Sequence, residues 1–126
     1  MNGATYDAGA LIAAERGSRE MWRYHWHLLQ NGVRPSLSAA VLGQVWRGGP
    51  QPLLSRFLQG CQIASLTESQ ARTAGGALAS SGTEDLVDAV VVITALARGD
   101  VVVTSDPDDM RRIAQALGRA LKLRVV

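Results

Sequence analysis

The chain has 126 residues, of which 47% are hydrophobic and 19% are charged, and it carries a net charge of +2. This length and composition predict one domain over residues 1–126, while the single cysteine, Cys61, excludes an intramolecular disulfide and argues against a zinc site built from thiolates. No apolar run approaches the roughly 18 residues needed to cross a bilayer and the N-terminus lacks a signal-peptide pattern, so we expect a cytoplasmic protein without membrane association.

Hydrophobic periodicity predicts that short strands and helices follow one another along the whole chain. Apolar residues three and four apart indicate helices, and short Val/Ile-rich runs indicate buried strands. In chain order, the pattern predicts strand 3–7, helix 8–15, helix 18–31, strand 33–37, helix 38–46, helix 53–58, strand 62–66, helix 67–78, helix 86–97, strand 101–104, helix 107–117 and strand 123–126. Thr67 and Gln70 have the spacing of a capping box, and the small residues 79–82 are predicted to form a turn.

Two segments near the C-terminus indicate how these elements pack. Residues 86–97 are apolar almost all round and residues 101–104 are a continuous β-branched run, so both are buried on more than one side. Strands that alternate with helices in this way form a parallel sheet covered by helices on both faces. We therefore expect an α/β fold.

Four aspartates fall where a parallel sheet builds its sites, at the carboxyl ends of strands and the starts of the following helices. Asp7 closes the first strand, Asp106 and Asp109 follow strand 101–104, and Asp88 begins the buried helix. Each position also has a structural explanation. Asp7 and Asp106 can be plain N-caps, and a charge such as that of Asp109 favours a helix N-terminus in any case.

Asp88 is the hardest of these residues to explain structurally, because a carboxylate at the edge of an apolar helix is costly to bury without a partner. The sequence offers no obvious buried Lys or Arg, whereas a cation shared with Asp7 and Asp106 would satisfy all three carboxylates. Ligation by oxygen alone suits Mg²⁺ or Mn²⁺ and is poor for zinc or copper. Asp85 favours the start of the same helix by its charge, with Thr83 as the predicted N-cap.

The remaining charges permit a polyanionic partner. Without Asp7, Asp88, Asp106 and Asp109, 7 acidic residues remain against 13 basic ones, which leaves about +6 on the rest of the surface. Only Lys122 is a lysine, and arginine suits bidentate phosphate contacts, although a GC-rich genome also enriches arginine. An acidic pocket on a basic body fits a metal-dependent enzyme that holds a polyanion.

Three segments resemble the motifs of PIN-domain ribonucleases of the VapC-like toxin type. Residues 6–12 are similar to the opening motif, Val87-Asp88-Ala89 resembles the third acidic position, and residues 103–110 resemble the fourth, where Thr/Ser-x-Asp follows a buried strand. This ordered set spans nearly the whole chain. The resemblance implies a three-layer α/β/α fold with a parallel sheet of about five strands. It also implies a hydrolase that uses Mg²⁺ or Mn²⁺ to cleave RNA to a 5′-phosphate and a 3′-hydroxyl, a cognate antitoxin protein and a homodimer.

One position departs from the PIN pattern. The helix after the second strand normally carries Glu or Asp, and this chain has Gln44 in that place. An amide offers a metal a carbonyl oxygen but no charge, so we expect weaker metal binding, with Gln44, Asp85 and Asp109 as auxiliary ligands.

Several other side chains have both a structural and a functional interpretation. His25 and His27 lack ligand spacing and are not predicted to be catalytic, while Thr104 and Ser105 either position the phosphate or simply end a strand. Base stacking is the alternative for four aromatic residues predicted to pack in the core or a dimer interface: Trp22, Tyr24, Trp26 and Trp46.

Two functions from different classes remain. The first is an endoribonuclease in which Asp7, Asp88 and Asp106 hold a metal that activates water for attack on a phosphodiester. The second is a catalytically weak PIN module that binds RNA or a protein partner, and Gln44 is its main support. A phosphoacceptor receiver domain is disfavoured, because Asp7 stands alone after the first strand and the only lysine is Lys122.

Overall fold

The computed structural model describes residues 2–83 and 85–126. Its strands are β1 (Ala4–Tyr6), β2 (Ser36–Ser38), β3 (Gln62–Ala64), β4 (Val101–Thr104) and β5 (Leu123–Val125). Its helices are α1 (Ala8–Glu15), α2 (Arg19–Gln30), α3 (Ala39–Val45), α4 (Pro52–Gln59), α5 (Glu68–Ser81), α6 (Leu86–Arg98) and α7 (Pro107–Ala116). Every strand and helix predicted from the sequence is present, in the predicted order.

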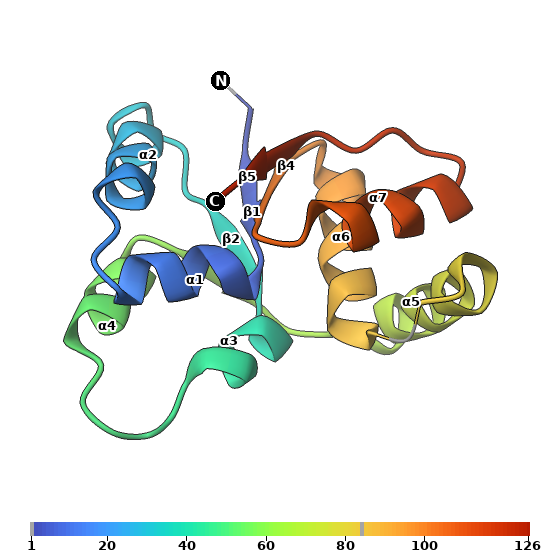
Figure 1. Ribbon diagram of the computed structural model, residues 1–126, viewed down its shortest axis with the longest axis horizontal. Helices are drawn as coiled ribbons and strands as arrows, with labels where there is room; N and C mark the ends of the chain where they lie inside the picture. Colours follow the sequence, from blue (N-terminus) through green and yellow to red (C-terminus); the bar gives the residue numbers. More distant parts are fainter. Residues whose placement is uncertain (1, 84) are drawn as a thin grey trace.

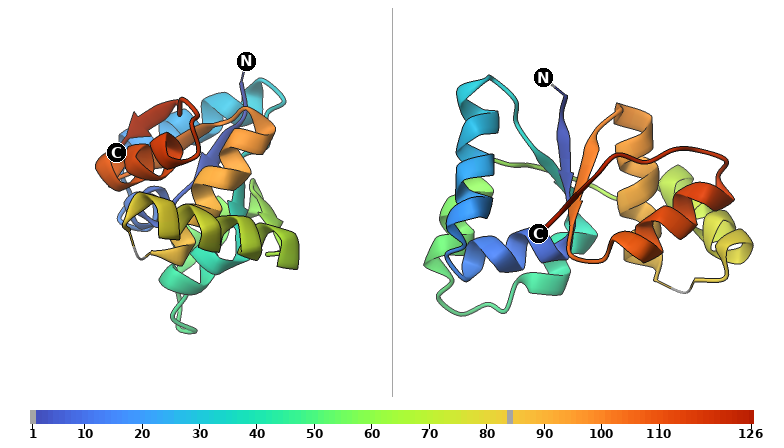
Figure 2. Two further views of the ribbon diagram at one scale, coloured as in Figure 1. Left: turned by 90° about the vertical axis from the view of Figure 1, so that its right-hand side faces the viewer. Right: turned by 45° about the horizontal axis from the view of Figure 1, so that its top comes forward.

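The strands form one parallel sheet in the order β3-β2-β1-β4-β5. Helices α1, α2 and α4 lie on one side of this sheet and α5, α6 and α7 lie on the other (Figure 1 and Figure 2). The three-layer α/β/α arrangement confirms the expected PIN-like fold. Because β2 and β4 flank β1 on opposite sides, the chain crosses the sheet in opposite directions there, and such switch points are where open α/β sheets place their sites.

The core on the α2 side is built around Tyr6, the last residue of β1. Its hydroxyl and Nδ1 of His25 are hydrogen-bonded at 2.8 Å, and the His25 ring stacks on Phe57 with 3.9 Å between ring centroids. Both Tyr6 and His25 are fully buried, and burial lowers the pKa of His25 to about 4. His25 is therefore a neutral core residue, and it contacts the end of β1, directly before Asp7.

The other side of the sheet is covered by α6, whose buried residues point both to the sheet and to α5 and α7. This is the packing that its nearly continuous apolar sequence predicts. The helix ends at Gly99, which adopts the left-handed conformation with φ 70° that favours glycine. Its first turn lies beside the start of α7, which positions two of the acidic segments close together (Figure 2).

Some predicted boundaries are wrong. The predicted turn over residues 79–82 is helical up to Ser81, because α5 ends only at Gly82, which has φ 73°. Small residues show no hydrophobic periodicity, so the sequence contains no pattern that indicates a helix there. Strands β2 and β3 are shorter than predicted, and Trp46 lies just beyond the end of α3.

The tryptophans divide into two groups. Trp22 packs edge-on against Phe57 at 5.1 Å between centroids and is partly buried against the core, as predicted. Trp26 and Trp46 are 52% and 44% exposed, so the prediction that they are core residues is wrong. Their alternatives, dimer packing and base stacking, remain predictions. In the part of the chain that the structure describes, no helix is long and apolar enough to cross a membrane.

Candidate metal centre

Asp7 lies at the carboxyl end of the central strand, directly before α1. Its amide donates to the carbonyl oxygen of Val103 at 3.0 Å, and its side chain is buried. The hydroxyl of Thr104 donates to Oδ2 of Asp7 at 2.8 Å, whereas the Asp7 side chain makes no capping hydrogen bond within the described residues. Burial raises the pKa of Asp7, and the hydrogen bond from Thr104 opposes this rise. The plain N-cap interpretation of Asp7 is therefore wrong.

Thr104 connects this aspartate to the next acidic segment. Besides donating to Asp7, its Oγ1 accepts a hydrogen bond from the amide of Asp106 at 2.9 Å, and the side chain is fully buried. A valine would suit the strand equally well but could not make either bond. Thr104 does more than end its strand, because it orients Asp7 and shapes the turn that carries Asp106.

The start of α6 is capped by Asp85. Its Oδ1 accepts a hydrogen bond from the amide of Asp88 at 3.1 Å. The prediction of Thr83 as the N-cap is wrong, because its hydroxyl bonds instead to that of Ser81 at 2.9 Å. Asp85 therefore has a structural role that fixes the first turn of α6, and through it the backbone position of Asp88.

Asp88 is the most strongly perturbed acid of this region. Its side chain is only 8% exposed. Its pKa rises to about 7, first through burial and then through the negative charges of Asp7, Asp85, Asp106 and Asp109. No ion pair among residues 2–83 and 85–126 includes Asp88, so a positive charge is what this environment lacks.

The start of α7 supplies the remaining acids. The side chain of Asp106 is exposed and makes no capping hydrogen bond in the described structure, so its plain N-cap interpretation is wrong as well. Its pKa is raised by desolvation and then by the charge and hydrogen bond of Asp109. Asp109 is half-buried and has Arg112 at 3.7 Å. Asp108 points to solvent and pairs with Arg111 at 3.5 Å.

Three of these carboxylates converge. Oxygen atoms of Asp88, Asp106 and Asp109 lie within 4.8 Å of one another. Oxygens that share one Mg²⁺ each lie about 2.1 Å from it, hence up to about 4 Å apart, so a small contraction brings these three within ligation distance. Asp7 is outside this group of described residues, yet its charge is the largest charge effect on the pKa of Asp88.

The donor set fits the predicted cation. All donors are carboxylate oxygens, which suits a hard divalent cation such as Mg²⁺ or Mn²⁺. Of the three predicted principal ligands, Asp88 and Asp106 are brought together. Asp109, predicted as an auxiliary ligand, is the third member of the group. Thr104 connects Asp7 to this group, because its hydroxyl donates to Asp7 and accepts from the amide of Asp106.

Gln44 lies exposed on α3, whose first residue directly follows β2. Its backbone oxygen accepts a hydrogen bond from Arg47 at 2.7 Å. Its role as an auxiliary ligand remains a prediction.

Asp100 is a buried acid that the sequence did not single out. It accepts hydrogen bonds from the hydroxyl of Thr5 at 2.9 Å and from Nε of Arg98 at 3.2 Å. This carboxylate stands before β4, at the opposite end of the strand from Asp106. Its partners show how this fold satisfies a structural buried acid, and Asp88 has no equivalent cation among the described residues.

Comparison with solved structures supports the same fold. A chain in a crystal structure of VapBC2 from Rickettsia felis, bound to a DNA fragment from their promoter, has a TM-score of 0.77 and 17% identity over 98% of each chain. A chain of a toxin-antitoxin complex from Klebsiella pneumoniae has a TM-score of 0.65 and 20% identity over 84% of this chain and 88% of that chain. No family model and no curated protein matches the sequence. The resemblance to VapC-like PIN toxins is thus confirmed in the fold.

Proposed function

We propose that the chain is a metal-dependent endoribonuclease, the toxin of a cytoplasmic toxin-antitoxin pair, and that it works with a cognate antitoxin and forms a homodimer. The observation that carries this proposal is the group of converging carboxylates at the switch point of a PIN-like sheet, in which neither Asp88 nor Asp106 has an ion-pair partner among the described residues. The similar solved structures, VapBC2 and a toxin-antitoxin complex, support the assignment to such a pair.

The acidic residues have distinct tasks in this proposal. Asp88, Asp106 and Asp109 hold Mg²⁺ or Mn²⁺, with Asp7 completing the negative environment. A divalent cation bound there supplies charge stabilisation at the phosphodiester and activation of the attacking water.

Two other residues keep this arrangement in place. Thr104 holds the carboxylate of Asp7 in one orientation through its 2.8 Å hydrogen bond. Asp85 fixes the helix turn that presents Asp88. These contacts organise the acids before any ligand binds, which reduces the reorganisation that binding requires.

The test compares cleavage of a labelled single-stranded RNA with Mg²⁺, with Mn²⁺ and with EDTA. Cleavage should require a divalent cation, and Asp88→Asn should abolish it. Asp108→Asn is the matched control, because Asp108 is an aspartate in the first turn of α7 that points to solvent, and this variant should keep full activity. Mn²⁺ should also raise the melting temperature of the wild-type protein, since neutralising clustered carboxylates favours the folded state.

A second candidate function is a catalytically weak module that binds RNA or a protein partner. The uncharged Gln44, where the PIN pattern has an acid, favours it. RNA binding without cation-dependent cleavage by the wild-type protein would support this alternative and contradict the nuclease proposal.

A further inference from the structure

Two surface pockets lie beside α1. The first has a volume of about 500 Å³ and is lined by Gly9, Ile12, Ala13, Arg16, Gly17, Ser18, Ser105 and Val126. The second has a volume of about 300 Å³ and is lined by Gly17, Arg19, Trp22, Trp26, Leu53 and Arg56. Gly17 lines both, so we treat them as one feature, the α1 groove. Most of its lining residues belong to α1, α2 and α4, which lie on one side of the sheet (Figure 1).

One end of the α1 groove borders the acidic centre. Ser105 lies in the chain between Thr104, which is bonded to Asp7, and Asp106. Gly9 packs directly on this residue, because a Cβ at Gly9 would stand only 2.7 Å from the amide nitrogen of Ser105. This end of the groove is therefore next in the chain to Asp106.

The groove has the chemistry of a site for single-stranded nucleic acid. It contains three arginines, Arg16, Arg19 and Arg56, and no acidic residue lines either pocket among the residues that the structure describes. Its far end contains Trp26, which is 52% exposed and lies 6.3 Å from Trp22 between ring centroids. A positively charged groove with exposed aromatic rings binds phosphates and stacks bases without reading a sequence.

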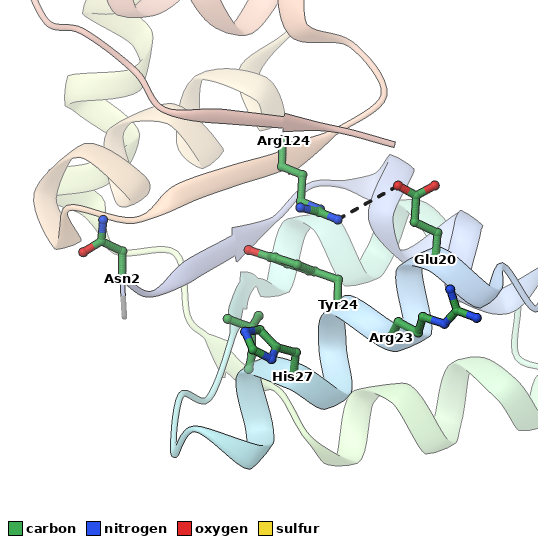
Figure 3. A pocket seen from close by; sticks show the side chains of 7 residues that line it. Asn2, Glu20, Arg23, Tyr24, His27 and Arg124 are labelled. Atoms are coloured by element: carbon green, nitrogen blue, oxygen red, sulfur yellow. Dashed lines mark ion pairs between the residues drawn. The ribbon is translucent and has the colours of Figure 1, made fainter.

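Another pocket, of about 510 Å³, is less suited to a polyanion. Figure 3 shows that Glu20 projects into it, with its carboxylate 4.0 Å from Arg124. The guanidinium of Arg124 also lies over the ring of Tyr24, 4.2 Å from its centroid. The acid partly neutralises the basic side chain and the basic side chain covers one aromatic face, which disfavours base stacking on Tyr24.

We propose that the α1 groove holds the single-stranded segment of RNA next to the scissile phosphodiester, with Arg16 on a neighbouring phosphate and Trp26 against a base. This inference rests on the proposed nuclease function and assigns its substrate path. Along α1, from Gly9 to Arg16, the path covers about 10 Å at 1.5 Å per residue, so it extends beyond the acidic centre itself.

The test measures binding of fluorescein-labelled oligouridine to the Asp88→Asn protein, which should bind without cleaving. In this background, Arg16→Ala should weaken binding by about fivefold or more and should reduce the salt slope of log affinity by about 0.7, the loss of one phosphate contact to a single strand. Trp26→Ala should weaken binding by a similar factor with an unchanged salt slope, because stacking releases no counterions. Arg72→Ala, which alters an exposed arginine of α5, is the control and should change affinity less than twofold.

The outcomes separate this inference from the proposed function. If the wild-type protein cleaves RNA but Arg16→Ala and Trp26→Ala bind like their parent, the groove assignment is wrong and the nuclease remains. If the parent protein binds no RNA, the groove assignment is also overturned. If the groove variants lose binding while the wild-type protein never cleaves, the RNA path stands and the nuclease proposal fails. Melting temperatures of all variants identify any loss of affinity that comes from unfolding.

Discussion

Replacing Asp88 with asparagine should stabilise the metal-free protein while removing its activity. Burial and four neighbouring negative charges raise the pKa of Asp88 from 3.8 to about 7. The charged form of Asp88 therefore opposes folding. The stability that protonated Asp88 contributes is fully present below its ordinary pKa and is lost as the pH rises through about 7. At about 1.4 kcal/mol per pKa unit, this loss reaches at most about 4 kcal/mol at about pH 8.

The assay is urea unfolding in EDTA at about pH 5 and about pH 8. Asp88→Asn should be more stable than wild type by up to about 4 kcal/mol at the higher pH, and the difference should shrink to about 2 kcal/mol at the lower one. Asp108→Asn, on the exposed side of the same acidic region, should change neither value. Mn²⁺ should then raise the stability of the wild-type protein more than that of Asp88→Asn. A metal-free Asp88→Asn protein less stable than wild type at pH 8 would refute the reasoning, because it would mean that the Asp88 carboxylate already has its partners.

Three further predictions concern ligands and buried charge. Gln44→Glu adds a negative ligand, so the Mn²⁺ affinity measured by calorimetry should rise several-fold; an unchanged affinity would mean that this side chain faces away from the site. Asp106→Asn should lower RNA cleavage by orders of magnitude, because Asn keeps the size of the side chain but not its charge, whereas Asp108→Asn should cleave normally; equal rates would exclude Asp106 as a ligand. Burial lowers the pKa of His25 to about 4, so the contribution of His25 to the free energy of unfolding should fall by up to about 3 kcal/mol as the pH drops from about 6.5 to about 4; the Asp88→Asn background removes the opposite contribution of Asp88. His25→Phe should show a shallower dependence in urea unfolding, and an identical slope would contradict a neutral buried His25.

The fold could be predicted from the sequence where burial leaves a pattern. Residues 86–97 and 101–104 are apolar almost all round because α6 packs against the sheet and against α5 and α7, and β4 lies inside the sheet; the predicted bounds of both are within one residue of those observed. The predictions fail where the hydrophobic pattern of the sequence does not match the secondary structure or the burial of the residues. Ala79, Ser80 and Ser81 are helical without an apolar period. Trp26 is apolar in character yet exposed, so its residue type alone indicated the wrong environment.

The acidic centre was predictable in its chain positions but not in its spacing. Strand ends and helix starts indicated Asp7, Asp88 and Asp106, because parallel strands deliver such residues to one edge. Which oxygens come within 4.8 Å depends on the turn before α7, and this turn brings Asp109 into the group instead of Asp7. The double hydrogen bond of Thr104 was equally hidden, since a threonine at a strand end has the same sequence signature with or without it.

The hydrogen bond between Thr104 and Asp7 ties one part of the acidic centre to the sheet, while the part at the start of α7 lies at the surface. Both residues belong to or directly follow β1 and β4, the central strands, and their amides are held by the sheet. Amide hydrogens there exchange with solvent only when the whole domain opens, whereas the first turn of α7, at the surface, can open by itself. We therefore expect the half of the centre on the strands to open only with the fold, and the half with Asp106 and Asp109 to open more often. In the proposed nuclease, substrate and product would then enter and leave on the α7 side.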